Sequence, residues 1–131
     1  MIVVDTNILA YLYLPTELSA SAEALLAKES DWAVPLLWRS EFRNILAGYL
    51  RRGILPYEAA LAIQTEAEAL VAGAEHDVSS RSVLELVRDS DCSAYDCEFV
   101  ALAKALDVKL VTADKKLLRA FPTVAMGLPA V

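Results

Sequence analysis

Short apolar runs alternate along this chain with longer segments in which apolar residues recur every three or four positions. The short runs predict β-strands, and the periodic segments predict amphipathic helices. Strands are expected at residues 1–4, 32–34, 76–78, 108–112 and 124–126. Helices are expected at residues 16–28, 36–53, 56–71, 80–88, 93–106 and 115–120. This alternation favours an α/β fold with a parallel sheet, and no linker or repeat divides the pattern, so we expect a single domain over residues 1–131.

Two of the predicted helices carry a long apolar stripe that should be buried. In the helix after Pro35 the stripe has the spacing of one helical face and comprises Trp38, Phe42, Ile45, Leu46, Tyr49 and Leu50. In the helix at 93–106 it comprises Tyr95, Phe99, Leu102, Ala103 and Leu106. Gly53 is expected to end the first of these helices, because glycine adopts the backbone conformation that terminates a helix at little cost.

Four acidic residues stand where packing alone would not place them. Asp5 directly follows the first strand, and Asp114 follows the strand at 108–112. The carboxyl ends of parallel strands form the edge of a sheet at which ligands bind. Glu41 and Asp96 border the apolar faces of their helices, although removing a carboxylate from water is costly unless something compensates it. We therefore expect the four acids to converge on one rim of the sheet.

Three of these acids also have a purely structural interpretation. Asp96 can complete a capping box with Ser93, and Asp114 can cap the helix that follows it. Asp5 and Asn7 can hydrogen-bond to the backbone of their own turn, which is the commonest use of such residues. What favours a site is that all four acids occur together, each at a place that the predicted topology brings to the same edge.

Composition indicates a sizeable core and no membrane segment. Of the 131 residues, 56% are apolar, and the mean hydropathy is +0.41, which leaves apolar surface for a partner. There is no run of about 18 apolar residues, and the N-terminal apolar stretch is too short for a signal peptide, so we expect a cytoplasmic protein. Cys92, Cys97 and His76 are too few for a disulfide framework or a thiolate or imidazole metal site.

The distribution of charge matters more here than its sum. A net charge of -6 is unfavourable for binding nucleic acid, because affinity for phosphates comes from Lys and Arg. The basic residues nevertheless form two clusters, Arg39, Arg43, Arg51 and Arg52 in one and Lys115, Lys116 and Arg119 in the other. Both clusters are also compatible with solvated helix faces, and Arg39 and Arg43 are placed to pair with Glu41 at the surface.

The chain carries "DTN" at Asp5, Glu41 within a helix, "SAYDCEFVALA" around Asp96 and "TADKKL" around Asp114. Through these motifs it resembles the PIN-domain family, and within it the VapC-type toxins, over nearly its whole length. The resemblance implies a three-layer α/β/α fold with a central parallel sheet. It also implies that these four acids are the catalytic residues and the metal ligands. Oxygen ligands without His or Cys suit Mg²⁺ or Mn²⁺. The implied activity is metal-dependent endoribonuclease cleavage of RNA phosphodiester bonds by the toxin of a toxin–antitoxin pair.

Further residues are expected to support such a site. Thr6 and Asn7 should shape the turn after the first strand and contact the metal shell or a phosphate, and Thr112 should hold a carboxylate in its orientation. The residues expected to attract RNA are Arg39, Arg43 and Lys115. The resemblance also implies a cognate antitoxin, whose C-terminal segment lies across the groove, and a homodimer. We expect the contacts with these partners near residues 22–26 and 49–61.

Two other functions are compatible with the sequence. In one, the same fold is catalytically silent and acts as a module that holds RNA or a protein partner. In the other, the chain resembles a response-regulator receiver, which also gathers acids and a lysine at a sheet edge. A receiver needs its phosphoacceptor Asp at the end of a central strand, whereas Asp96 is predicted to lie inside a helix.

Overall fold

The computed structural model describes residues 1–131 and is built around a five-stranded sheet in which every neighbouring pair is parallel. The order of the strands across the sheet is β3-β2-β1-β4-β5. Their bounds are β1 Ile2–Val4, β2 Trp32–Pro35, β3 Glu75–His76, β4 Leu110–Thr112 and β5 Ala125–Gly127. All five predicted strands are present, and β1, β2 and β4 are apolar because both faces of a parallel sheet are covered.

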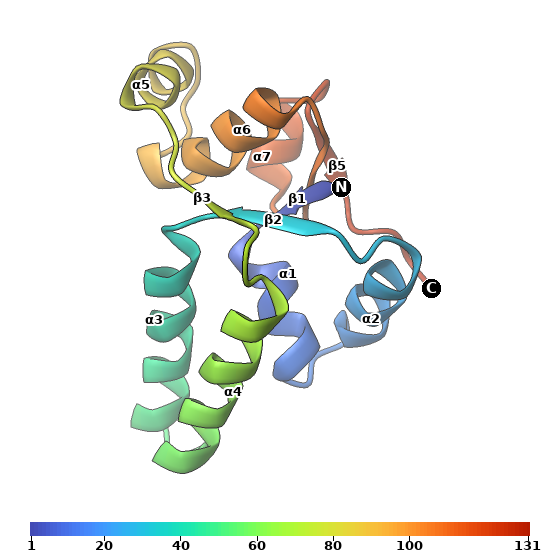
Figure 1. The fold of residues 1–131 in the computed structure, drawn as a ribbon, viewed down its shortest axis with the longest axis vertical. Coiled ribbons are helices and arrows are strands. Elements are labelled where there is room, and N and C mark those ends of the chain that lie inside the picture. Colours follow the sequence, from blue (N-terminus) through green and yellow to red (C-terminus); the bar gives the residue numbers. More distant parts are fainter.

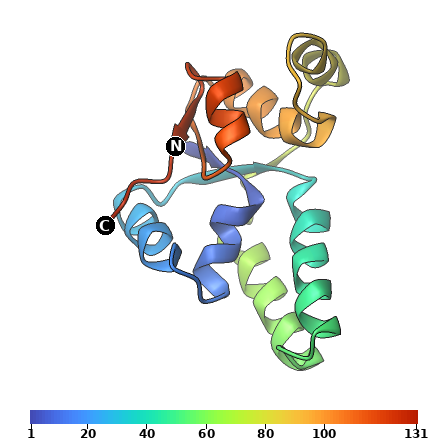
Figure 2. The same ribbon diagram turned by 180° about the vertical axis from the view of Figure 1, so that it is seen from behind.

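Seven helices cover the two faces of the sheet. Their bounds are α1 Thr6–Tyr13, α2 Ser19–Lys28, α3 Trp38–Arg51, α4 Tyr57–Leu70, α5 Ser80–Arg88, α6 Ala94–Leu106 and α7 Lys115–Ala120. Helices α1–α4 lie on one face and α5–α7 on the other, and α3 and α4 project from the sheet as a hairpin (Figure 1). Figure 2 shows the same layers from behind. The three-layer α/β/α fold expected from the sequence is therefore confirmed, and no helix has the length and apolar character needed to cross a membrane.

The first helix, α1, is absent from the elements predicted from the sequence. The sequence pattern assigns residues 6–13 to no element, but the chain turns at Asp5, whose side chain accepts a hydrogen bond from the Ile8 N–H and caps the helix. The helix predicted from Thr16 begins instead at Ser19. The Thr16 hydroxyl oxygen accepts a bond from the Leu18 N–H at 3.0 Å and is used within a turn, so α2 has no side-chain cap.

Each of the two predicted apolar stripes includes one residue, near an end of its helix, that is exposed in the structure. Trp38, Phe42 and Leu46 are buried on α3, as expected, but Leu50 near the end of that helix is exposed. On α6, Tyr95 is 63% exposed and belongs to the surface, which corrects its assignment to the buried stripe. The position of Tyr95 in the first turn of α6 leaves its ring without a neighbouring layer to pack against.

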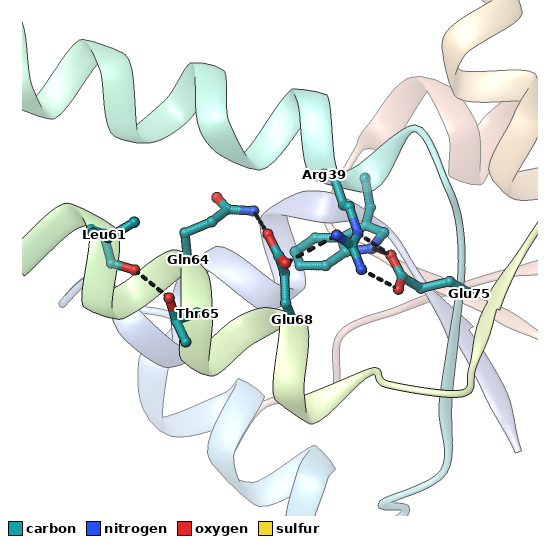
Figure 3. Close-up of polar contacts among 7 residues, drawn as sticks. Arg39, Leu61, Gln64, Thr65, Glu68 and Glu75 are labelled. Carbon is teal, nitrogen blue, oxygen red and sulfur yellow. Dashed lines mark hydrogen bonds and ion pairs between the residues drawn. The ribbon is translucent and has the colours of Figure 1, made fainter.

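A polar network fastens the start of α3 to the edge strand β3 (Figure 3). Arg39 donates from Nε to Glu75 Oε2 at 2.6 Å and from Nη2 to Glu75 Oε1 at 2.7 Å. The Trp38 indole donates to the same carboxylate at 2.7 Å, and Arg39 Nη1 donates to Glu68 Oε1 on α4 at 3.0 Å. The bonds from Arg39 lower the pKa of Glu75 below its usual value. This network holds the helix turn that carries Glu41.

Replacing Glu75 by Gln removes this charge at nearly constant size. We expect Glu75→Gln to lower the free energy of unfolding by about 1–3 kcal/mol at pH 7. Because the folded-state pKa of Glu75 is depressed, its stabilisation is present above the pKa of the unfolded chain and is lost as pH falls through the folded-state pKa. Urea unfolding between pH 7 and pH 3 should therefore show the gap between wild type and variant narrowing in acid.

The matched control is Glu23→Gln, since Glu23 is exposed on α2 and makes no ion pair. Its stability should stay within about 0.5 kcal/mol of wild type. Equal stabilities of the two variants at pH 7 would contradict the role given to Glu75.

Candidate active site

A pocket of about 240 Å³ opens at the carboxyl edge of the sheet. Residues from the start of α1, from α3, from α6 and from the turn between β4 and α7 form its wall. They are Asp5, Thr6, Asn7, Glu41, Asn44, Ile45, Asp96, Phe99 and Asp114. The structure thus brings together the four acids that the sequence predicted, together with Thr6 and Asn7.

Asp5 and Asp114 are linked through Thr112. The strands β1 and β4 are parallel neighbours, with Val4 opposite Val111, so their carboxyl ends meet. The fully buried Thr112 hydroxyl donates to Asp5 Oδ2 and accepts from the Asp114 N–H at 2.9 Å. The contact expected between Thr112 and a carboxylate is therefore present.

Glu41 is held by α1. The hydroxyl of Thr6, which is buried at the start of α1, donates to Glu41 Oε1 at 2.6 Å. Glu41 forms no ion pair with Arg39 or Arg43, so the surface-pairing interpretation is wrong. Instead, its partly buried carboxylate faces the pocket from the first turn of α3.

The interpretation of Asp96 and Asp114 as helix-capping residues is correct in part, and a capping role does not prevent an acid from lining the pocket. Ser93 Oγ accepts from the Asp96 N–H at 3.0 Å and caps α6, and the Asp96 carboxylate lines the pocket. Asp114 Oδ1 accepts from the Lys116 and Leu117 N–H groups at 2.8 and 3.3 Å and caps α7. Its second oxygen has no protein partner, so Asp114 can cap a helix and serve the pocket at once.

Burial and mutual repulsion disfavour the charged forms of these acids. Burial raises the pKa of Asp5 to about 6, against hydrogen bonds from Thr112 and the Ile8 N–H, and the charges of Asp114 and Glu41 add to the rise. Burial also raises the pKa of Glu41, as does the nearby charge of Asp96. The pKa of Asp96 is raised by burial and then by the charge of Asp114.

The donor set fits a hard divalent cation. No three acidic, His or Cys side chains lie close enough together to hold an ion as they stand. The pocket nevertheless gathers four carboxylates with the amides of Asn7 and Asn44, and no Lys or Arg forms an ion pair with any of the four acids. A cation would relieve the repulsion that raises the pKa values of the acids, and oxygen donors suit Mg²⁺ or Mn²⁺.

The other predicted residues lie outside the pocket. The guanidinium of Arg39 is occupied by Glu75 and Glu68, which removes Arg39 from the residues that can attract RNA. Arg43 and Lys115 are exposed and form no ion pair. The sequence reasoning missed Asn44, which is three residues after Glu41 and therefore shares its helix face.

The class of protein is defined by comparison with known families. The model of the PIN domain family matches residues 2–121 of this chain. The chain therefore belongs to the PIN domain family, which confirms the resemblance found in its motifs. Membership in this family also excludes the receiver-like alternative.

Individual relatives cover almost the whole chain. Ribonuclease VapC3 of Pyrobaculum aerophilum is 31% identical over 124 residues, which are 92% of this chain and 95% of that protein. The crystal structure of FitAcB from Neisseria gonorrhoeae superposes with a TM-score of 0.76 at 17% identity and covers 96% of both chains. A toxin-antitoxin complex from Klebsiella pneumoniae gives a TM-score of 0.70 at 18% identity and covers 100% of both chains. The two structures show that the fold is shared.

Thr112 offers a direct test of the site's construction. Thr112→Val keeps the shape of the side chain but deprives Asp5 of a donor and the Asp114 N–H of an acceptor. We expect a loss of about 1–3 kcal/mol in the free energy of unfolding, because buried groups are left without partners. The matched control is Thr65→Val, since Thr65 is exposed on α4 and bonds only to the Leu61 carbonyl (Figure 3). Equal urea midpoints for the two variants would contradict the linking role of Thr112.

Proposed function

We propose that this chain is a metal-dependent endoribonuclease that acts as the toxin of a toxin–antitoxin pair. The observation that carries the proposal is the convergence of Asp5, Glu41, Asp96 and Asp114 on one pocket without a pairing cation from the protein. The name of the archaeal relative, Ribonuclease VapC3, supports the choice of reaction. The substrate would be RNA, cut by hydrolysis of a phosphodiester bond.

The four acids would hold Mg²⁺ or Mn²⁺, directly or through water. When bound, the ion would supply a water of lowered pKa and stabilise the charge that develops on the phosphodiester. Thr112 and Thr6 would keep the carboxylates of Asp5 and Glu41 in orientation, the supporting role that metal sites require. The exposed side chain of Asn7 would offer an amide to a phosphate oxygen.

Positive charge near the pocket would draw the RNA towards it. Arg43 follows Glu41 by two residues and Lys115 follows Asp114 directly, and both are exposed and unpaired. Such charges raise the rate of encounter with a polyanion even when the net charge of the protein is negative.

We also propose that this protein is cytoplasmic, that it binds a cognate antitoxin and that it forms a homodimer. The Klebsiella pneumoniae structure is described as a toxin-antitoxin complex, which supports a partner of this class. In the predicted contact region at 22–26, Ala22 and Leu25 are buried, whereas the tip of the α3–α4 hairpin exposes apolar side chains. They are Leu50, Ile54, Tyr57 and Leu61.

Light scattering and co-expression with the neighbouring small gene test these two partners. A protein that stays monomeric throughout the micromolar range would contradict the homodimer, and the absence of a complex on co-expression would contradict the antitoxin.

Cleavage of RNA by the purified protein tests the activity. The wild type should cut a structured RNA in Mg²⁺ or Mn²⁺ and stop in EDTA. Asp5→Asn and Asp96→Asn each remove one charge at nearly constant size and should lower the rate by roughly 100-fold or more. A rate in Asp5→Asn equal to that of wild type would contradict its assignment as a metal ligand.

The control for these variants is Asp107→Asn. Asp107 is exposed and ends α6 in the left-handed region, with a φ of 54°, which Asn tolerates well. It lies just before β4 in the chain, so it is far from the carboxyl edge, and its substitution should leave the rate unchanged. No cleavage by any folded protein, together with RNA binding that is indifferent to divalent ions, would favour the catalytically silent binding module.

A further inference from the structure

A second hollow, of about 350 Å³, lies between α7 and the loop that precedes α6. Lys116 and Arg119 line it from α7, three residues apart and therefore on one face of the helix. Asp89 and Asp91 line it from the loop. We call this the α7 hollow.

The α7 hollow adjoins the acidic pocket. The main-chain N–H of Lys116 donates to Asp114 Oδ1 at 2.8 Å, so the residue that begins the hollow touches a residue of the pocket. Lys116 therefore lies between the two sites, and Arg119 lies one turn further along α7.

The charges around the hollow leave a positive excess. Asp89 is neutralised by Arg88, which donates to its two carboxylate oxygens at 2.8 and 2.9 Å. Lys116 and Arg119 form no ion pair, and Asp91 also has no partner. Two unpaired cations therefore face one unpaired anion, in a chain whose net charge is -6. Unpaired cations beside a pocket that would cleave a phosphodiester can bind the phosphates of the same RNA strand.

We propose that Lys116 and Arg119 bind a backbone phosphate of the RNA next to the scissile one. This inference rests on the proposed ribonuclease function and extends it, because it assigns a second phosphate site on the same strand. Phosphate contacts fix the register and orientation of a nucleic acid without reading its sequence. The α7 hollow would thus hold the strand so that one phosphodiester lies over the acidic pocket.

Such a contact also answers an electrostatic problem. Four carboxylates repel an RNA strand, and a bound ion offsets only part of their charge. Lys116 beside the pocket and Arg119 one turn further along α7 supply attraction where the strand must lie. The benefit is positional, so the substitution of either residue should raise KM with little effect on kcat.

Equilibrium binding of a labelled single-stranded RNA tests the proposal separately from cleavage. The Asp96→Asn protein, in Mg²⁺, serves as the parent, so that the RNA stays intact. Adding Lys116→Gln or Arg119→Gln should weaken binding several-fold and reduce the slope of log affinity against log salt by about 0.7 each, the value for one phosphate contact on a single strand. Lys28→Gln, an exposed lysine on α2 without an ion pair, removes the same charge elsewhere and should change neither quantity.

Asp91→Asn supplies a test of opposite sign. Removing the unpaired anion of the hollow should tighten RNA binding, a result that damage to the fold would not produce. The α7 hollow would be overturned as a phosphate site if the Lys116 and Arg119 variants had the same RNA affinities and salt slopes as Lys28→Gln. It would also be overturned if the parent did not bind RNA. Wild-type protein that binds RNA in the predicted way but never cleaves it would overturn the proposed function alone.

Discussion

The hydroxyl of Thr112 joins the central strand β1 to its neighbour β4 at the point where the site begins. It donates to the carboxylate of Asp5 and accepts from the main chain of Asp114, so β1 and β4 are tied together at their carboxyl ends. The parallel register of these strands makes this contact possible, and the burial of Thr112 protects it from water. Burial raises the pKa of Asp5 to about 6 against this hydrogen bond, and the charges of Asp114 and Glu41 add to the rise.

Structural and chemical roles are combined in the same carboxylates. Asp5 caps α1 with one oxygen and Asp114 caps α7 with one oxygen, while both line the pocket. A helix N-terminus stabilises a nearby carboxylate, and this partly compensates the burial of these groups. Asp96 differs, since Ser93 and not the acid supplies the cap of α6. An acid that caps a helix is therefore not excluded from a metal site.

The acids of the pocket could be predicted because their positions follow from topology. A strand end such as Asp5, or a helix face such as that of Asp96, is visible in a single sequence. The pairing of Arg39 was not predictable, because Glu75 is distant in the chain and meets it only through the β2–β3 contact. Helix α1 was missed because only Asp5 separates it from β1, and its start is fixed by the cap at Asp5. Asn44 carried no signal beyond its spacing from Glu41.

The central claim is that the four acids form one cation site, and calorimetric titration of Mn²⁺ into the metal-free protein tests it most directly. We expect wild type and Asp107→Asn to bind the ion equally well and to gain free energy of unfolding with the logarithm of the ion concentration above Kd. Asp96→Asn should bind at least about 10-fold more weakly, because it loses one charged ligand while its fold is kept. Undetectable binding by wild type, or equal binding by Asp96→Asn, would contradict the claim.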